Sequence, residues 1–338
     1  MKQEKRGCRS LVAVSVILVF SIFLITGCGG TGIDAPANAP TTPFLEGSRG
    51  VEIKFLEGAP PEEVTDSGTF DFQAIVSLRN EGEYDLKRDD IKVDLLGILA
   101  SDFGANPDEL NDKRPDDDPM PRRRDAEGNI IEATEVFVTF PNEDQFFDYE
   151  RSVTGNTVFL FRADVCYKYQ TKALSQICVL SDLVNVDADT VCDPIETKTV
   201  FSSSSPLQVN SFRQTVAGQN KIQFSFDITH SGNGDVFKEG DASSPAADCP
   251  RDPRERRQKE NRVKVTVDSG LPNLRCVGLD GNTVGFVTMN QGRRTVTCLQ
   301  ELDSDRQDFE TNVDITLDFN YRDDVDEEVL VKHLVDSS

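Results

Sequence analysis

Residues 221–229 have the sequence KIQFSFDIT, in which polar and apolar side chains alternate strictly. Successive side chains of a β-strand point to opposite faces of its sheet, so this pattern predicts a strand with one buried face. The same alternation, or a short apolar strand pattern, recurs in four other segments, at residues 70–78, 263–267, 313–321 and 329–334. Few stretches have helical spacing, and turn signals separate short strands. The sequence therefore predicts an all-β chain built from immunoglobulin-like β-sandwiches.

The length of 338 residues favours two domains. A Ser-rich segment at residues 202–206 is the clearest composition break after the amino-terminal region, and we place a linker there. Tandem sandwiches are then expected over residues 47–201 and 207–338. The first sandwich carries a long polar insertion over residues 101–131, which is either a loop that docks a partner or a mobile solvated loop.

The amino terminus has the features of an export signal. Basic residues precede the apolar segment 11–26, which ends in Ile-Thr-Gly-Cys at residues 25–28. These four residues resemble a lipobox, which implies lipidation of Cys28 after removal of residues 1–27. Two alternatives stay open, which are an uncleaved single-pass anchor and a pilin-like signal cleaved after Gly7. Residues 28–46 are rich in Gly, Pro, Ala and Thr, as in a flexible linker.

The composition excludes several function classes. Lys and Arg total 36 against 59 Asp and Glu, a net charge of -23, so clustered cations for binding nucleic acid are not expected. With only two His residues, the chain offers little for His-based acid/base catalysis, and without Trp it has no Trp platform for binding sugars. The sequence lacks a G-x-S-x-G elbow, a P-loop and an H-E-x-x-H motif. We therefore predict that the protein is not an enzyme and has no catalytic residues.

Six cysteines follow the signal and linker, and in an exported protein they predict three disulfides. They are Cys166, Cys178, Cys192, Cys249, Cys276 and Cys298. Three lie on each side of the proposed boundary, so full pairing requires at least one bridge between the halves. Cys276 and Cys298 flank a candidate hairpin and are expected to pair. We expect Cys166 to pair with Cys178 or Cys192, and the cysteine left over to reach Cys249.

Both predicted domains open with a strand, a turn and a second strand that ends in a polar Asn/Gly turn. These turns are Asn80-Glu81-Gly82 and Ser231-Gly232-Asn233-Gly234. Here the chain resembles the immunoglobulin-like, CARDB-like modules of archaeal and bacterial surface proteins. The run Cys166-Tyr167-x-Tyr169-x-Thr171 is also similar to archaeal surface proteins with such domains. The resemblance implies a fold and a location at the cell surface, and no activity.

One loop has the ligand spacing of an EF-hand calcium loop. Asn185, Asp187, Asp189, Asp193 and Glu196 stand at relative positions 1, 3, 5, 9 and 12. Thr190 replaces the glycine expected at position 6, so the alternative is an acidic surface loop held by Cys192. Apart from calcium, no cofactor is expected.

Three further charged runs need an interpretation. Residues 251–259 (RDPRERRQK) could bind an anionic polymer or form internal salt links. The acidic clusters at residues 303–305 and 323–328 are expected to be solvated turns.

These observations predict a non-enzymatic lipoprotein on the outer face of a membrane, with a structural or adhesive role. Its expected partners are the membrane, through the amino-terminal anchor, and other surface proteins or polymers. The first alternative is a pilin-like filament subunit. The second is a secreted hydrolase or a solute-binding lipoprotein.

Overall fold

The structure is a computed structural model that describes residues 42–186, 189–240, 247–279 and 282–334. These residues form mostly antiparallel β-strands, and the all-β prediction is confirmed. Within these ranges, no helix combines the length and the apolar composition of a membrane span. Cys28 and the predicted signal lie outside the described residues. Residues 43–338 form one compact unit, and the description below concerns that unit.

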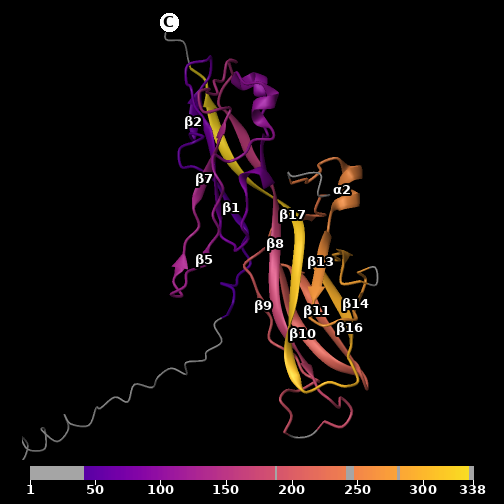
Figure 1. The fold of residues 1–338 in the computed structure, drawn as a ribbon. Coiled ribbons are helices and arrows are strands. Elements are labelled where there is room, and N and C mark those ends of the chain that lie inside the picture. Colours follow the sequence, from indigo (N-terminus) through magenta and orange to yellow (C-terminus); the bar gives the residue numbers. More distant parts are fainter. Residues whose placement is uncertain (1–41, 187–188, 241–246, 280–281, 335–338) are drawn as a thin grey trace, which may run out of the picture. The chain divides into compact units, whose positions relative to one another are not determined.

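Two long strands organise this unit (Figure 1). Strand β8 spans Thr157–Val179 and β17 spans Phe309–Lys332. They run side by side and pair antiparallel without interruption, from Val179 opposite Phe309 to Thr157 opposite Val331. One continuous ribbon therefore connects segments of the chain that lie on opposite sides of the proposed domain boundary.

The other strands of the large sheet attach to different parts of this ribbon. On β8 they are β4 (Ile91–Leu96) and β9 (Phe201–Ser202). On β17 they are β13 (Arg262–Asp268), β12 (Asp235–Phe237) and, in parallel, β2 (Glu63–Thr65). Strand β15 (Val284–Thr288) extends the sheet beyond β13.

Two smaller sheets complete the architecture, one at each end of the ribbon in Figure 1. The first contains β1 (Val51–Phe55), β3 (Ala74–Asn80) and β7 (Glu135–Phe140), in the order β1-β3-β7. The second has the order β10-β11-β16-β14, with β10 at Leu207–Gly218, β11 at Lys221–His230, β16 at Arg293–Glu301 and β14 at Leu274–Val277. A short hairpin of β5 (Arg123–Arg124) and β6 (Ile130–Ile131) stands apart from these sheets.

The core follows from the alternation of side chains. In β11, Ile222, Phe224, Phe226 and Ile228 are all buried, as predicted. Most buried apolar residues of both halves belong to one connected cluster that extends from Val51 to Val331. Burying such side chains contributes about 1.5–3 kcal/mol each, so this shared cluster couples the stability of the halves.

The acidic run at residues 323–328 is part of β17, and the expectation of a turn there was wrong. These residues pair with β8 in regular register. Arg162 of β8 donates two hydrogen bonds to the Asp326 carboxylate, at 2.6 and 2.7 Å. Paired charge and cross-strand bonding therefore permit a strand where the composition alone indicated a break.

The Ser-rich segment 202–206 lies inside the molecule. Ser202, Ser203, Ser204 and Ser205 are all buried. The Thr171 hydroxyl donates to Ser205 Oγ at 2.7 Å, and the Lys172 backbone N–H donates to Ser203 Oγ at 3.0 Å. These serines are thus hydrogen-bonding partners of β8, and the division into two domains at this point stays a prediction.

The two halves share one local arrangement. The Tyr169 hydroxyl of β8 donates to Asn80 Oδ1 at 2.9 Å, and the Tyr321 hydroxyl of β17 lies 3.0 Å from His230 Nε2. Asn80 ends β3, the central strand of its sheet, and His230 ends β11, one of the two inner strands of its sheet. The glycine two positions later, Gly82 or Gly232, lies so close to the tyrosine that a Cβ atom would stand 1.8 or 2.2 Å from the hydroxyl oxygen. The two predicted Asn/Gly turns therefore occupy matching places, one beside Tyr169 of β8 and one beside Tyr321 of β17.

Candidate functional site

The insertion over residues 101–131 is folded against the first small sheet. It includes the 3-10 helices η2 (Ala100–Phe103) and η3 (Pro107–Leu110). Phe103 is fully buried and packs edge-on against Phe147 and Phe161, with ring centroids 6.2 and 5.4 Å apart. A capping box starts η3, because the Asn106 backbone N–H donates to Glu109 Oε2 at 2.8 Å. Apolar packing and capping together fix the insertion in place.

Part of the insertion covers the edge of β7, which has β3 on one side only. The Asp116 N–H donates to the Phe137 carbonyl at 3.0 Å, and the Phe137 N–H donates to Asp116 Oδ1 at 2.9 Å. An exposed edge with unpaired backbone groups invites pairing with another chain. Asp116 therefore occupies both backbone hydrogen-bonding groups of Phe137 on this edge, so that they cannot pair with another strand.

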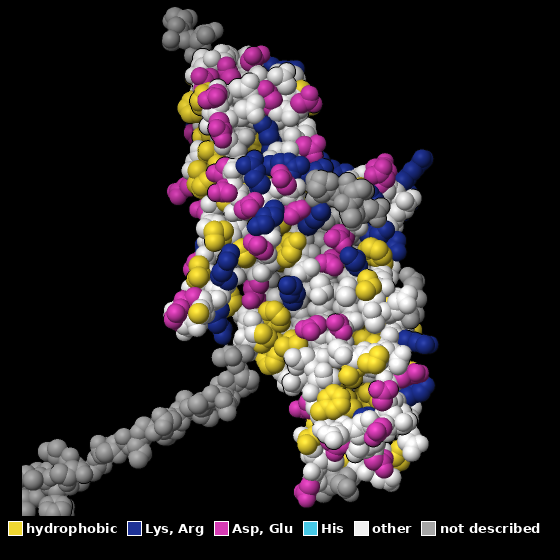
Figure 2. Space-filling model, in the orientation of Figure 1, with side chains coloured by type: hydrophobic (Ala, Val, Ile, Leu, Met, Phe, Trp, Pro, Cys, Tyr) yellow, Lys and Arg dark blue, Asp and Glu magenta, His cyan; other side chains and the backbone are white. Residues whose placement is uncertain are grey.

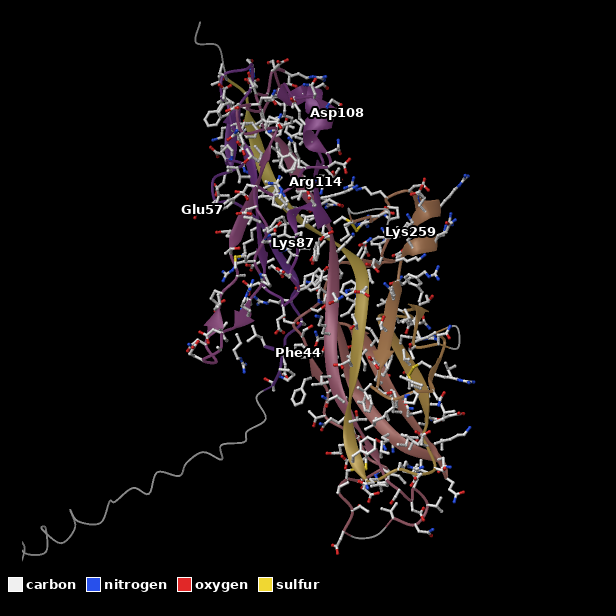
Figure 3. The ribbon with its side chains drawn as sticks, viewed as in Figure 1. Phe44, Glu57, Lys87, Asp108, Arg114 and Lys259 are labelled. Carbon is white, nitrogen blue, oxygen red and sulfur yellow. A yellow bond between two sulfur atoms is a disulfide. The ribbon has the colours of Figure 1, made fainter. Side chains whose placement is uncertain are left out.

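Two cavities of about 650 and 580 Å³ lie beside Asp116, and both have Asp116 and Phe137 in their walls. The larger one is also lined by Arg88, Lys113 and Arg114. Figure 3 labels Arg114, and Figure 2 shows Lys and Arg side chains gathered in a band on the same face, with acidic side chains between them. Because these walls are polar and mixed in charge, they suit a polar ligand or peptide better than an apolar one.

The cations of the larger cavity have partners within the protein. Arg88 donates from Nη1 to the Asp116 carbonyl at 2.8 Å, and Arg114 donates from Nη1 to the Asp89 carbonyl at 2.6 Å. An anionic ligand would have to compete with these contacts.

Lys113 and Asn142 line the larger cavity, and Asn142 also contacts the Glu109 carboxyl group. Lys113 Nζ donates a short hydrogen bond to Asn142 Oδ1, and Asn142 Nδ2 donates to Glu109 Oε1 at 3.5 Å. Burial lowers the pKa of the Lys113 ammonium group, an effect that the Glu109 charge opposes. The Asn106 N–H lowers the pKa of the Glu109 carboxyl group, so Glu109 is ionised at neutral pH. An amine beside an amide carbonyl and a carboxylate is a reactive combination.

Nothing in the sequence singled out this cluster. Lys113 is one of many charged residues in the insertion, and Asn142 follows β7 at a distant point in the chain. Only the fold brings them together, because Lys113 pairs through its backbone with Val93 at the edge of β4.

A smaller cavity of about 290 Å³ lies where the halves meet, lined by Tyr167, Tyr321 and Asp323 among others. Burial raises the pKa of the Asp323 carboxyl group. The Tyr321 hydroxyl accepts a hydrogen bond from the Gly234 N–H at 2.8 Å. Burial lowers the pKa of His230, which is therefore uncharged at neutral pH, and its ring packs edge-on against Tyr321. Tyr321, His230 and Gly234 are therefore engaged with one another at the junction.

The six cysteines form three disulfides, which are Cys166–Cys249, Cys178–Cys192 and Cys276–Cys298. The last pair is as expected, and Cys276 lies directly opposite Cys298 in β14 and β16. Cys166 pairs with Cys249 and not with Cys178 or Cys192, which was the expectation. Cys178 ends its strand close to the loop that carries Cys192, whereas Cys166 lies twelve positions earlier in β8, near the junction of the halves. The bridge between residues on either side of the proposed boundary is thus made by Cys166.

The residues proposed as calcium ligands lie on the loop that follows β8. Asp187 lies outside the described residues. The other four are exposed or have local partners: Asn185 with Asp182, Asp193 with the Ile195 N–H, Glu196 with Lys198, and exposed Asp189. Among the described residues, no three His, Cys, Asp or Glu side chains are grouped as metal ligands. A calcium site here stays a prediction.

The same loop exposes apolar side chains to solvent. Val184, Val186, Val191 and Ile195 are all more than 40% exposed, between acidic neighbours. Exposed apolar groups with a polar rim are typical of interaction surfaces.

The basic run 251–259 forms internal salt links. It contains α2 (Pro253–Lys259), which Asp252 caps by accepting hydrogen bonds from two backbone N–H groups. Arg251 contacts Asp94 and Asp164 at 2.6 and 2.9 Å, and so joins the loop to β4 and β8. Arg256 pairs with Asp235 and Glu260. The run therefore reinforces the junction next to the Cys166–Cys249 disulfide.

His333 pairs with Asp66, which is fully buried. Asp66 also accepts hydrogen bonds from the Val153 and Leu334 N–H groups at 2.9 Å. The hydrogen bond from His333 and these two N–H groups hold the pKa of the Asp66 carboxyl group far below its usual range. This buried carboxylate fastens the end of β17 to the rest of the molecule.

No protein-family model matches the chain, and no curated protein matches it.

Proposed function

We propose that the protein is an exported, membrane-anchored surface scaffold made of two immunoglobulin-like β-sandwiches, with no catalytic activity. The observation that carries the proposal is the shared β8–β17 ribbon, closed at the junction by the Cys166–Cys249 disulfide. A ribbon that serves both halves prevents them from hinging as independent domains. Such stiffness suits a scaffold that holds its binding surface at a fixed distance from the membrane.

The disulfides support the location outside the cytoplasm. Disulfides persist in oxidising surroundings and are rare where thiols are kept reduced. Three of them use all six cysteines that follow the predicted signal and linker. The lipobox-like residues at 25–28 supply a route to the membrane, with Cys28 as the lipidated residue.

Exposed apolar side chains support an adhesive role for the surface. Val184, Val191 and Ile195, on the acidic loop tied down by Cys192, offer an apolar contact area to another surface protein. The strongly acidic remainder of the chain keeps the protein soluble and resists nonspecific association.

The test is to determine where the mature protein begins and which side of the membrane it faces. Intact host cells are treated with an external protease, and the mature amino terminus is identified by mass spectrometry. We expect degradation of residues 43–338 from outside, a lipid-modified Cys28 and no free thiols among the six paired cysteines. A mature chain that begins at Cys8 would support the filament subunit instead. A protected, reduced protein would refute export.

A further inference from the structure

We propose that Lys113 and Asn142 form an intramolecular isopeptide bond, with Glu109 transferring the proton that the reaction requires. The bond joins Lys113 Nζ to Asn142 Cγ and replaces the side-chain amide of Asn142. This crosslink is a modification of the chain by itself and does not depend on the proposed location.

Two contacts that the reaction requires are already in place, one on each side of the Asn142 amide. Lys113 Nζ contacts Asn142 Oδ1, which places the nitrogen next to the carbonyl carbon that it attacks. On the opposite side of the same amide, the leaving nitrogen Nδ2 faces Glu109 Oε1 at 3.5 Å. Holding reactants in such an orientation converts a slow encounter into a reaction within one molecule, worth about 7–11 kcal/mol of the barrier in well-oriented cases.

Neighbouring contacts hold both partners in place. Gln73 Nε2 donates to the Asn142 and Gln145 carbonyls, both at 2.8 Å, and so fixes the turn after β7. Asn142 Nδ2 also donates to Gln145 Oε1 at 2.5 Å. Lys113 is held by reciprocal backbone hydrogen bonds with Val93, at 2.9 and 3.0 Å.

The reaction is an exchange of one amide for another and involves no change of oxidation state. The Lys113 ammonium group first releases one proton to water in the adjoining cavity, which its lowered pKa favours. The neutral amine attacks Cγ, and the C–O π electrons move onto Oδ1. The Glu109 carboxylate accepts a proton from the attacking nitrogen and gives it to Nδ2. The Cγ–Nδ2 bond breaks, the carbonyl re-forms, and ammonia leaves and takes up the proton released earlier as ammonium.

The position of the bond gives it a structural role. Lys113 is attached to the edge of β4 in the large sheet, whereas Asn142 directly follows β7 and Pro141 at the end of the first small sheet. A covalent bond between them would join the two sheets of the first half. The described disulfides leave that role unfilled. Cys178–Cys192 ties the end of β8 to the loop after it, Cys276–Cys298 joins β14 to β16, and Cys166–Cys249 lies at the junction.

The test is mass spectrometry of the full-length protein after reduction and denaturation. We expect the wild type to be lighter than its mature sequence by the mass of one ammonia. Trypsin should then fail to cleave after Lys113, and the digest should contain residues 93–122 joined to residues 125–151. Arg114 precedes Pro115 and is not a competing cleavage site.

Two variants separate reaction from folding. Lys113→Arg keeps the positive charge but cannot form the bond, so its mass should equal its sequence. Glu109→Gln keeps a side chain that suits the capping box, but it cannot shuttle a proton, so most of its molecules should be unlinked. The matched control is Lys92→Arg, a half-buried lysine paired with Asp112, which should crosslink like the wild type.

A wild-type mass equal to the sequence, with normal cleavage after Lys113, would overturn the proposal. A linked peptide that joins Lys113 to a residue other than Asn142 would overturn it as well. Full crosslinking in Glu109→Gln would overturn the role of Glu109.

Discussion

Removing the Cys166–Cys249 disulfide should destabilise the protein more than removing Cys178–Cys192. In the chain-entropy relation, a disulfide stabilises the native state by restricting the unfolded chain, and the effect grows with the length of the closed loop. The two bridges have sequence separations of 83 and 14 residues. At 25 °C these separations correspond to about 4.5 and about 3 kcal/mol. We therefore expect a difference of about 1.5 kcal/mol between the two variants.

The comparison is well matched because each pair has one buried cysteine and one half-buried partner. The two double Cys→Ala variants therefore lose similar packing. Their free energies of unfolding are measured by denaturant titration of the oxidised protein, with circular dichroism as the readout. Equal destabilisation, or a larger loss in the Cys178–Cys192 variant, would refute the view that the bridge across the junction acts through its long loop.

Three other outcomes follow from the structure. Gly82→Ala should cost about 3 kcal/mol in a thermal melt, because overpacking would drive a methyl group into the Tyr169 hydroxyl. Gly218→Ala should change stability little, because its methyl group would meet only the Lys221 side chain, at an ordinary contact distance of 3.9 Å; similar melts for both would contradict this. The folded pKa of Asp66 lies below the unfolded value near 3.8, so its contribution is present above that pH and is lost as the pH falls through the folded pKa. Asp66→Asn should accordingly be less stable than the wild type at pH 7, but it should lose less unfolding free energy on acidification to pH ~2. The same difference in denaturant midpoint between the variant and the wild type at both pH values would contradict this. Residues 207–338 expressed alone should fail to give a cooperative calorimetric transition, since β8 would be missing; a sharp independent transition would restore the picture of separable domains.

The fold class was predictable because alternation depends on local physics. In β11, each apolar residue of the quoted segment faces the core, since a strand must place every second side chain on one face. The same logic located β13 and the first part of β17. It failed at residues 323–328, where charge density indicated a turn. There the deciding contact is Arg162, which lies far away in the sequence.

The candidate site was not predictable from the sequence for a related reason. Lys113, Asn142 and Glu109 are ordinary residues at ordinary spacings, and their chemistry arises only when β4 and β7 bring the insertion against the turn after β7. Cysteine parity showed that a bridge must cross the boundary, but parity cannot select the cysteine that makes it. That choice depends on where each residue lies along β8.

The pairing of β8 with β17 bears on how the molecule stays together. If the two strands belonged to separate chains, each would carry an unpaired edge, and such an edge recruits another strand. In this protein both strands belong to one polypeptide, so an association that would otherwise depend on concentration takes place within a single molecule. Dilution cannot separate the halves.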